Sequence, residues 1–384
     1  MLAILSRNSR PQKHLLTSFV PFFTGKNSTR ILCNVVILLH KVIALEDALK
    51  IEKPLFIDMR SPGEYEEGHI PGAINIPLFN DHERAEVGTI YKQVGVIEAK
   101  QRGLAIVSSK LPELVNQIRS FYQTGYSIII YCWRGGMRSK SVVTVLDLMG
   151  ITAYQLIGGY KAYRRFVLDR LRTFELRPEI IVICGSTGVG KTALLGKLAE
   201  KQVPVIDLES LANHRGSVFG QVGLGKSQTA QNFDALLLQE LQRLSEKRYI
   251  VVECESKRIG NVYLPDVLYQ AMRRGKKILV QADLETRVSR LIAEYVDVYR
   301  NNTEALLVSL KALAKRLGTR KVTALSDKLL RGEVRDVVRI LLTDYYDPLY
   351  GYETANPDHF DLVVDANNLD QAACQIVEYL EQRR

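Results

Sequence analysis

Short apolar runs alternate with helix-like periodicity along the first regular part of the chain. Four of these runs have the length and composition of buried strands, and they lie at residues 54–58, 72–77, 126–132 and 153–156. Three stretches with helical periodicity lie at about 44–50, 110–123 and 138–149. The alternation is typical of a doubly wound α/β fold. We predict that this first domain covers residues 43–172.

The same pattern begins again after a charged connector at 172–178. Five apolar runs predict strands, at residues 179–184, 203–207, 249–253, 277–282 and 360–365. The longest helical stretch covers about 284–346 and is rich in basic residues. The sequence therefore predicts a second α/β domain over 173–384, with a helical, basic insertion at about 284–346.

The first 42 residues lack this regularity. The first 45 residues contain six Lys or Arg and no acid, and an apolar run at 31–39 is broken by Asn34. Nine residues are too few for a bilayer span, which needs about 20, and no small-residue cleavage site follows. We interpret residues 1–42 as a basic extension that is either poorly ordered or placed before the true domain by an upstream start codon.

Composition narrows the class of protein. With 46% hydrophobic and 24% charged residues, the chain has the balance of a soluble globular protein, which excludes disordered and collagen-like classes. Five scattered cysteines are too few for a disulfide framework or a zinc cluster, so we expect reduced thiols and a cytoplasmic protein. The net charge is +10, but six of those charges lie in the extension, so an anionic partner must be bound by local basic patches.

The strongest motif is a phosphate-binding loop. It consists of Gly185, Ser186, Thr187, Gly188, Val189, Gly190, Lys191 and Thr192. These residues match G-x-x-x-x-G-K-[ST] between an apolar strand and helical sequence. Backbone N–H groups and the helix N-terminus would bind phosphate, Lys191 would neutralise the outer phosphates, and Thr192 would offer its hydroxyl to Mg²⁺. The motif predicts a diphosphate or triphosphate ligand without deciding which.

Four carboxylates follow neighbouring strands of this second domain. They are Asp207, Glu209, Glu253 and Glu255. Ligands of parallel sheets bind at the carboxyl ends of the strands, so these side chains are candidates for Mg²⁺ binding or acid–base catalysis. Surface acids at strand ends are the alternative.

A second candidate site surrounds Cys132, which ends the most apolar strand of the first domain. A Gly-Gly loop separates it from the following helix, and Arg134 and Arg138 flank that loop. Backbone N–H groups, the helix dipole and these two arginines favour a thiolate, which is a nucleophile and can carry a persulfide. We predict Cys132, Arg134 and Arg138 as catalytic residues; a buried structural cysteine is the alternative.

The first domain resembles the rhodanese superfamily. Residues 56–77, FIDMRSPGEYEEGHIPGAINIP, follow the order of its N-terminal signature, in which His69 is expected to be structural. Five residues separate Cys132 from Arg138, whereas simple sulfurtransferases have four. The longer loop also resembles that of rhodanese-like phosphatases, and it leaves room for selenium or a phosphate-like anion.

A rhodanese-like domain followed by a phosphate-binding loop resembles the bacterial tRNA 2-selenouridine synthases over roughly residues 43–380. Further strings carry the resemblance, at 77–95, 207–220, 253–260 and 345–350. The resemblance implies a wobble 2-thiouridine substrate in tRNAs of the Lys, Glu and Gln class. It implies S-geranylation from geranyl diphosphate, then exchange for selenium from selenophosphate. A selenophosphate-producing enzyme would be a partner, and a membrane would not.

Nine bases against three acids at residues 311–340 form a candidate surface for RNA. The leading candidates are Lys311, Lys315, Arg316, Arg320 and Lys321. We expect the bases at 311, 315 and 316 to share one helix face, with a solvated face as the alternative.

Several aromatic and polar residues have two interpretations. Trp133, Tyr345, Tyr346 and Tyr350 either stack on anticodon bases or pack in the core. His214 and Arg215 are candidates for a polar site near the phosphates.

Two other functions fit the same motifs. One is an NTP-dependent tRNA sulfurtransferase that uses a Cys132 persulfide, and it predicts tRNA-stimulated ATP turnover. The other is a P-loop kinase whose rhodanese-like module is a C-x₅-R phosphatase, and it predicts indifference to RNA. The choice of selenium over sulfur comes from the resemblance, because both chalcogen anions suit the same loop.

Overall fold

The structure is a computed structural model that describes residues 40–352 and 356–382. The extension predicted for residues 1–42 therefore lies, for its first 39 residues, outside the described residues. The described residues cluster as one compact unit by their contacts. In the part of the chain that the structure describes, no helix is both long and apolar enough to cross a membrane.

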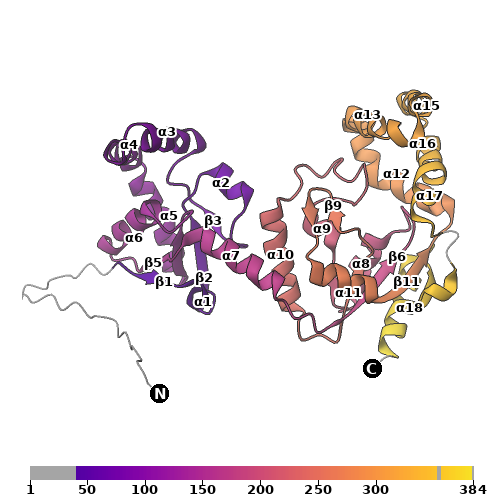
Figure 1. Cartoon of the computed structure of the whole chain (residues 1–384), viewed down its shortest axis with the longest axis horizontal. Coiled ribbons are helices and arrows are strands. Elements are labelled where there is room, and N and C mark those ends of the chain that lie inside the picture. The colour runs from indigo at the N-terminus through magenta and orange to yellow at the C-terminus, as the bar shows by residue number, and fades with distance from the viewer. Residues whose placement is uncertain (1–39, 353–355, 383–384) are drawn as a thin grey trace, which may run out of the picture. The chain divides into compact units, whose positions relative to one another are not determined.

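The first sheet is parallel and has the strand order β1-β5-β4-β2-β3 (Figure 1). Its strands are β1 (Val42–Ile43), β2 (Pro54–Asp58), β3 (Ile74–Asn75), β4 (Ser127–Tyr131) and β5 (Ala153–Leu156). Its helices are α1 (Leu45–Ala48), α2 (Pro62–Glu67), α3 (Asp81–Gln93), α4 (Val96–Ser108), α5 (Leu111–Gln123), α6 (Met137–Leu148) and α7 (Gly159–Arg172). The doubly wound fold predicted from the sequence is confirmed.

Strand β4 lies at the centre of this sheet because both of its faces are apolar. Ile128 and Ile130 pack into one hydrophobic cluster, while Ile129 and Tyr131 pack into another on the opposite face. All four residues are fully buried. The strand is therefore a rigid support for the loop that follows it, which begins at Cys132.

The second sheet is also parallel, in the order β12-β11-β6-β8-β7. Its strands are β6 (Glu179–Cys184), β7 (Val205–Ile206), β8 (Tyr249–Glu253), β11 (Lys276–Gln281) and β12 (Leu362–Asp365). Its helices are α8 (Lys191–Glu200), α9 (Leu208–Ala212), α10 (Ala230–Arg243), α11 (Asp266–Arg274) and α18 (Leu369–Glu381). A separate antiparallel hairpin consists of β9 (Arg258–Ile259) and β10 (Val262–Tyr263). The P-loop domain predicted from the sequence has this α/β architecture, with β6 central and its loop at the carboxyl edge.

The helical insertion between β11 and β12 has a core of its own. It consists of α12 (Leu284–Asn301), α13 (Thr303–Ala312), α14 (Ala314–Leu317), α15 (Thr319–Leu330), α16 (Val334–Leu341), a π-helix (Leu342–Tyr346) and α17 (Asp347–Tyr350). Apolar side chains from α12, α13, α15 and α16 form one cluster with the π-helix. In Figure 1 these helices lie together beyond one end of the second sheet.

The expectation that the bases at 311, 315 and 316 share one helix face is wrong. Lys311 lies near the end of α13, whereas Lys315 and Arg316 lie in the separate four-residue helix α14. The chain turns at Leu313 and again at Gly318, which has a left-handed backbone (φ +82°). The positive charge is thus distributed over a bend between helices.

The structure also resolves the two interpretations of the aromatic residues. Tyr345 and Tyr346 are buried in the core of the insertion, with 8% and 5% exposure, so they cannot stack on RNA bases. Trp133 is partly buried and packs against the core. Tyr350 is 44% exposed and remains available for contact with a ligand.

Candidate functional site

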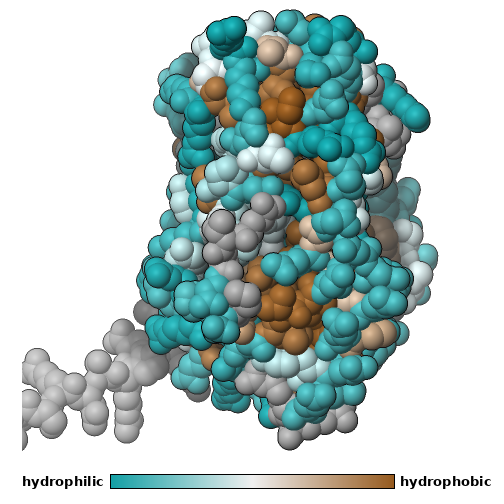
Figure 2. All heavy atoms as spheres, turned by 90° about the vertical axis from the view of Figure 1, so that its right-hand side faces the viewer, coloured by the Kyte–Doolittle hydropathy of each residue, from teal (hydrophilic) through white to brown (hydrophobic). Residues whose placement is uncertain are grey.

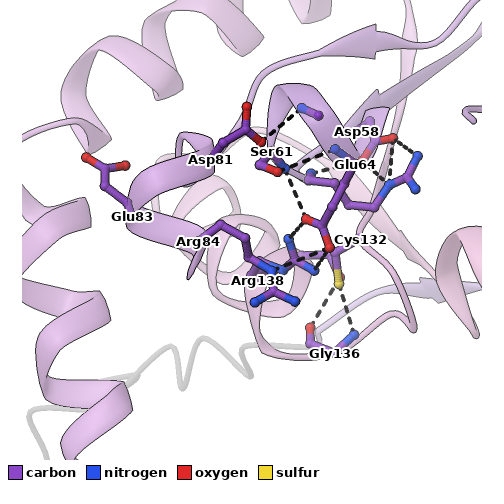
Figure 3. Close-up of polar contacts among 12 residues, drawn as sticks. Asp58, Ser61, Glu64, Asp81, Glu83, Arg84, Cys132, Gly136 and Arg138 are labelled. Atoms are coloured by element: carbon purple, nitrogen blue, oxygen red, sulfur yellow. Dashed lines mark hydrogen bonds and ion pairs between the residues drawn. The ribbon is translucent and has the colours of Figure 1, made fainter. Parts of the chain in front are cut away.

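The sulfur of Cys132 lies in a loop between β4 and α6, enclosed by polar groups. The backbone N–H of Gly136 donates a hydrogen bond to Sγ at 3.2 Å, and the Ser139 hydroxyl lies 3.2 Å from the same sulfur (Figure 3). Cys132 is only 3% exposed. Polar groups thus surround the sulfur on the side of the helix N-terminus, and the catalytic role of Cys132 stays a prediction.

The backbone of the loop is held by residues that the sequence analysis did not identify. Gln155 on β5 donates its side-chain N–H to the carbonyls of Gly135 (2.8 Å) and Gly136 (3.0 Å). A Cβ atom on Gly159 would lie 2.1 Å from the carbonyl oxygen of Cys132. No sequence pattern marks Gln155, because it reads as one polar position in a strand. The loop is therefore fixed in shape before any ligand binds.

The two arginines of the loop differ in their surroundings. Arg138 forms a bidentate ion pair with Glu64, with Nη1 2.6 Å from Oε2, and Arg84 approaches the same carboxylate at 3.4 Å (Figure 3). Burial would raise the pKa of Glu64, but the hydrogen bond and charge of Arg138 outweigh it and lower that pKa. Arg134 is exposed and forms no ion pair with any described residue. Of the two arginines, Arg134 is the one whose charge is not neutralised by a carboxylate.

Residues of the rhodanese-like signature form the buried part of this site. Asp58 and Arg60 are both fully buried and form an ion pair at 2.6 Å. The guanidinium of Arg60 lies 4.0 Å from the centre of the Tyr160 ring, and His69 stacks on Tyr65 with ring centres 3.9 Å apart. His69 therefore packs among signature residues, as expected of a structural histidine.

The phosphate-binding loop connects β6 to α8 with the backbone that its glycines allow. Gly188 and Gly190 have left-handed backbone angles of +82° and +90°, and Gly190 caps α8. Lys191 donates to the carbonyl of Gly185 at 3.0 Å, and Thr192 donates to Glu209 at 3.0 Å. All eight residues of the predicted loop thus lie at the junction of strand and helix.

Two arginines of α12 donate hydrogen bonds to the backbone of this loop. The sequence analysis identified neither of them. The Nε atom of Arg287 donates to the Thr187 carbonyl at 2.9 Å, and Nη1 of Arg290 donates to the Val189 carbonyl at 2.7 Å. Arg287 is buried and paired with Asp347. On sequence alone the two residues read as ordinary helix-surface charges.

The four predicted carboxylates have different partners. Glu253 is fully buried; one of its oxygens accepts from the Glu209 N–H at 2.7 Å, and the other has no hydrogen-bond partner among the described residues. Burial raises its pKa well above the usual range. Burial, together with the charge of Glu209, raises the pKa of Glu255 to about 8. Asp207 caps α9 by accepting from the Ser210 N–H at 2.8 Å.

The described carboxylates do not form a metal site by themselves. Across residues 40–352 and 356–382, no group of three or more His, Cys, Asp or Glu side chains could hold a metal ion. Thr192, the predicted Mg²⁺ ligand, donates its hydroxyl to Glu209. Mg²⁺ in phosphate-binding loops is held by one or two protein ligands together with phosphate oxygens, so the Mg²⁺ role of Thr192 and these carboxylates stays a prediction. Glu209 and Glu255 are also candidates for acid–base catalysis.

A cavity of about 930 Å³ adjoins the phosphate-binding loop. Its polar part includes Lys191, Thr192, Glu209 and Glu255, and Arg215 also lines it. Asp207, Arg290, Glu294 and Arg300 are further charged residues of the lining. Its apolar side chains come largely from the helical insertion and include Leu306, Leu310, Leu329, Val337, Leu341 and Leu342. Figure 2 shows apolar residues gathered in two areas of the face that carries the insertion. His214 and Cys132 are not among the residues that line this cavity.

The five predicted RNA-binding bases fall into two groups. Lys321 forms an ion pair with Asp344. The other four form no ion pair with any residue in the described ranges, and Arg316 lies over the Tyr345 ring at 6.0 Å. All four remaining bases of the stretch are paired, Lys328 and Arg331 with Glu333, and Arg335 and Arg339 with Glu285. The free charge is thus concentrated at residues 311–320.

Comparison with known proteins gives the same division of the chain into two modules. Residues 42–166 match the family model of the rhodanese-like domain, and residues 178–383 match the model of the tRNA 2-selenouridine synthase AAA domain. Among solved structures, a shikimate kinase from Bacteroides thetaiotaomicron is 17% identical, covering 53% of this chain and 98% of its own, with a TM-score of 0.26.

Curated relatives match most of the chain. A tRNA 2-selenouridine synthase from Pseudomonas syringae pv. syringae is 36% identical over 336 residues, which is 80% of this chain and 90% of the relative. One from Hydrogenovibrio crunogenus is 37% identical over 324 residues, or 77% and 88%. The chain therefore belongs to the tRNA 2-selenouridine synthase family, a family of tRNA-modifying enzymes.

Proposed function

We propose that this protein converts the wobble 2-thiouridine of tRNA into 2-selenouridine in two steps, at two sites. Geranyl diphosphate would alkylate the sulfur at the phosphate-binding loop, and selenium from selenophosphate would then replace the geranylthio group with the help of Cys132. The tRNAs would be those of the Lys, Glu and Gln class, and the reaction would take place in the cytoplasm, where these tRNAs are used.

The apolar cavity beside the phosphate-binding loop is the single observation that carries this proposal. A nucleotide would bring a base and a ribose that need polar partners, whereas the walls of this cavity are largely apolar side chains of the helical insertion. A ten-carbon isoprenoid needs only apolar contact along its tail and donors around its diphosphate. Both requirements are met within one cavity of about 930 Å³.

The residues around the loop support the first step. The thiouridine sulfur would attack carbon 1 of the geranyl group, and the bond from that carbon to the diphosphate oxygen would break. Lys191 and the N–H groups of the loop would hold the pyrophosphate that leaves. Alkylation of the sulfur releases the N3 proton of the base, and the Glu209–Glu255 pair, which lines the cavity, would accept it.

The Cys132 loop supports the second step. Its sulfur receives a hydrogen bond from the Gly136 N–H and lies beside the Ser139 hydroxyl. These donors would hold the selenium of selenophosphate against the sulfur, and the exposed, unpaired Arg134 would attract its phosphate part. The selenium would attack carbon 2 of the base, geranylthiol would leave with a proton, and hydrolysis of the P–Se bond would release phosphate. Arg138 would act mainly through Glu64, by fixing the position of the loop.

Two variants separate the steps. Full-length protein is incubated with 2-thiouridine-containing tRNA, geranyl diphosphate and selenophosphate, and the nucleosides are analysed by mass spectrometry. We expect Cys132→Ala to accumulate S-geranyl-2-thiouridine without 2-selenouridine. Lys191→Ala is expected to lose geranylation by roughly 10²- to 10³-fold, yet still to convert tRNA that is already geranylated.

Lys197 offers a matched control because it lies on the same helix as Lys191 and pairs with exposed Asp370. Lys197→Ala should retain both steps. Equal loss of both products in Cys132→Ala and Lys191→Ala would contradict two separate sites. Binding of ATP but not geranyl diphosphate to the reduced protein would favour the NTP-dependent sulfurtransferase instead.

A further inference from the structure

Two cysteines of the second domain face each other at the edge of the phosphate-binding loop. Cys184 is the last residue of β6, and Cys254 directly follows β8. The two strands are parallel and in register up to the pair formed by Ile183 and Glu253. The Cys254 N–H still donates to the Ile183 carbonyl at 2.8 Å. The strand pairing therefore continues by one position and places Cys184 opposite Cys254.

This placement suits a disulfide bond. Neighbouring strands lie about 4.7–4.9 Å apart, and disulfides join Cα atoms that are about 4.4–6.8 Å apart. Directly opposed residues of a sheet point to the same face, and both cysteines belong to one hydrophobic cluster. The Cys184 thiol lies near the Val182 carbonyl, the Tyr352 hydroxyl donates to Cys254, and both thiols are free in the structure.

The two thiols differ in access and in acidity. Cys184 is buried, with 2% exposure, whereas Cys254 is half-buried and lines the cavity. The neighbouring Cys184 thiol outweighs burial and, with the hydrogen bond from the Tyr352 hydroxyl at 3.2 Å and the charge of Lys191, lowers the pKa of Cys254 to about 6. The neighbouring Cys254 thiol, together with burial, raises the pKa of Cys184. A reactive sulfur thus faces the cavity, with a second thiol directly behind it.

We propose that Cys254 and Cys184 form a reversible disulfide that weakens diphosphate binding when a hydroperoxide enters the cavity. The Cys254 thiolate attacks the peroxide, the O–O bond breaks, and the alkoxide or hydroxide that leaves takes up a proton. The resulting sulfenic acid is attacked by the sulfur of Cys184, and its hydroxyl leaves with the Cys184 proton as water. Two electrons pass from the two thiols to the peroxide, and a dithiol reductant returns them.

The phosphate-binding loop cannot keep its position when this disulfide forms. The sulfurs must approach to about 2.05 Å, and Cys184 is joined directly to Gly185, the first residue of the loop. A Cβ atom on Gly185 would lie 2.4 Å from the Val280 carbonyl, so the start of the loop is already in close contact with β11. The movement must therefore displace the loop or the Cys254–Glu255 segment, and both of these line the cavity.

Peptide mapping of the full-length protein tests the bond itself. The protein is treated with hydrogen peroxide, free thiols are alkylated, and a digest is analysed by mass spectrometry. We expect a peptide that links Cys184 to Cys254 and disappears with dithiothreitol. In Cys184→Ser, dimedone should instead trap a sulfenic acid at Cys254. Cys374→Ser is the matched control, because Cys374 is exposed on α18, and it should retain the link.

Binding of inorganic pyrophosphate, measured by calorimetry, tests the consequence. Oxidation should weaken binding by roughly tenfold or more, since the loss of one hydrogen bond from the loop to a charged phosphate oxygen costs about that much affinity. Dithiothreitol should restore the affinity, and Cys184→Ser, whose folding is checked by its melting temperature, should resist the loss. Absence of the linked peptide overturns the proposal, as does a linked protein of unchanged affinity. Failure of the reduced protein to bind pyrophosphate would instead contradict the proposed function, and the peptide map would still decide whether the bond forms.

Discussion

The two anion-binding loops of this protein occupy the same position in two different sheets. Each loop follows the central strand of a five-stranded parallel sheet, β4 in one case and β6 in the other, and each leads into a helix capped by a glycine. The Cys132 loop encloses a buried sulfur and has one arginine already paired with a carboxylate. The loop at Lys191 opens instead into a large cavity with apolar walls.

This difference in surroundings indicates which kind of ligand each loop suits. The Cys132 loop offers a few donors around one atom, which suits a small anion carried on or near sulfur. The loop at Lys191 offers donors at one end of an apolar space, which suits a diphosphate with a long hydrocarbon body. The helical insertion therefore changes a common phosphate-binding fold into a candidate site for a prenyl diphosphate.

The largest effect is expected from filling the apolar space. Val338 on α16 lines the cavity, and Val338→Trp would occupy part of it. Each methylene of the substrate tail that loses burial costs about 0.8 kcal/mol, so we expect KM for geranyl diphosphate to rise by about 10- to 100-fold. Affinity for inorganic pyrophosphate should stay unchanged, because the loop itself is not altered. Steady-state kinetics and calorimetry measure the two quantities.

Val308 is the matched control for this variant. It lies on the neighbouring helix α13 and is 61% exposed, so Val308→Trp should leave KM unchanged. If Val338→Trp had no effect on KM, the cavity would not hold the geranyl tail. The apolar walls would then not distinguish the ligand of the Lys191 loop from that of the Cys132 loop.

The second prediction concerns the bases at the bend of the insertion. Lys311, Lys315 and Arg320 form no ion pair with described residues, and replacing all three by alanine should remove up to three phosphate contacts. Each contact contributes about 0.9 to the slope of log K against log salt for a duplex, so the slope should fall by about 2 to 3 and the affinity for tRNA by about tenfold or more at low salt. Filter binding across a salt series measures both.

A triple variant of paired bases gives the control. Lys328, Arg331 and Arg335 are close in sequence, but each forms an ion pair within the insertion. Their replacement by alanine should change the salt slope much less. If the paired set mattered more than the unpaired set, tRNA would contact another surface of the protein.

The sequence predicted the strands of both sheets well, for a physical reason. Runs such as 54–58, 153–156 and 249–253 are short and apolar, and in the structure they form β2, β5 and β8 with the same bounds. Buried parallel strands leave this mark because both of their faces pack against helices. Strand β1 was not predicted, because a strand of two residues is too short to show an apolar or alternating pattern.

The cavity could not be predicted, because its walls follow the same pattern as a packed core. Leu306, Leu310 and Leu329 occupy apolar positions of amphipathic helices and read as core residues. The sequence does not show how closely the helices of the insertion pack, so it cannot distinguish a filled core from one that contains a cavity. Arg287 and Arg290 were missed for a related reason: nothing in a helical pattern shows that its charged face meets a loop roughly a hundred residues away.

The third prediction tests whether the Glu209–Glu255 pair accepts a proton. Burial raises the pKa of Glu255 to about 8, so most of this group is protonated at neutral pH. Only the ionised form can accept the N3 proton, so the rate of geranyl transfer should rise by about tenfold between about pH 7 and pH 9. Glu255→Gln should flatten this rise, whereas Glu200→Gln, at the end of α8, should retain it. A flat profile in the wild type would exclude Glu255 as the group that limits the rate.

The smallest effect is expected for stability, at Glu253. Its pKa is raised well above the usual range by burial, so the folded protein holds this proton more tightly than the unfolded chain does. The free energy of unfolding then falls as the pH rises above the ordinary glutamate value of about 4.3, by up to about 1.4 kcal/mol per pH unit. Glu253→Gln cannot ionise and still accepts from the Glu209 N–H, so it should lose less stability between about pH 5 and pH 8. Urea unfolding at several pH values measures the difference, with exposed Glu246→Gln as the control. Parallel pH dependence in Glu253→Gln and the wild type would mean that Glu253 ionises in the folded protein, and a permanent charge beside the phosphate-binding loop would then oppose the anionic ligand proposed for it.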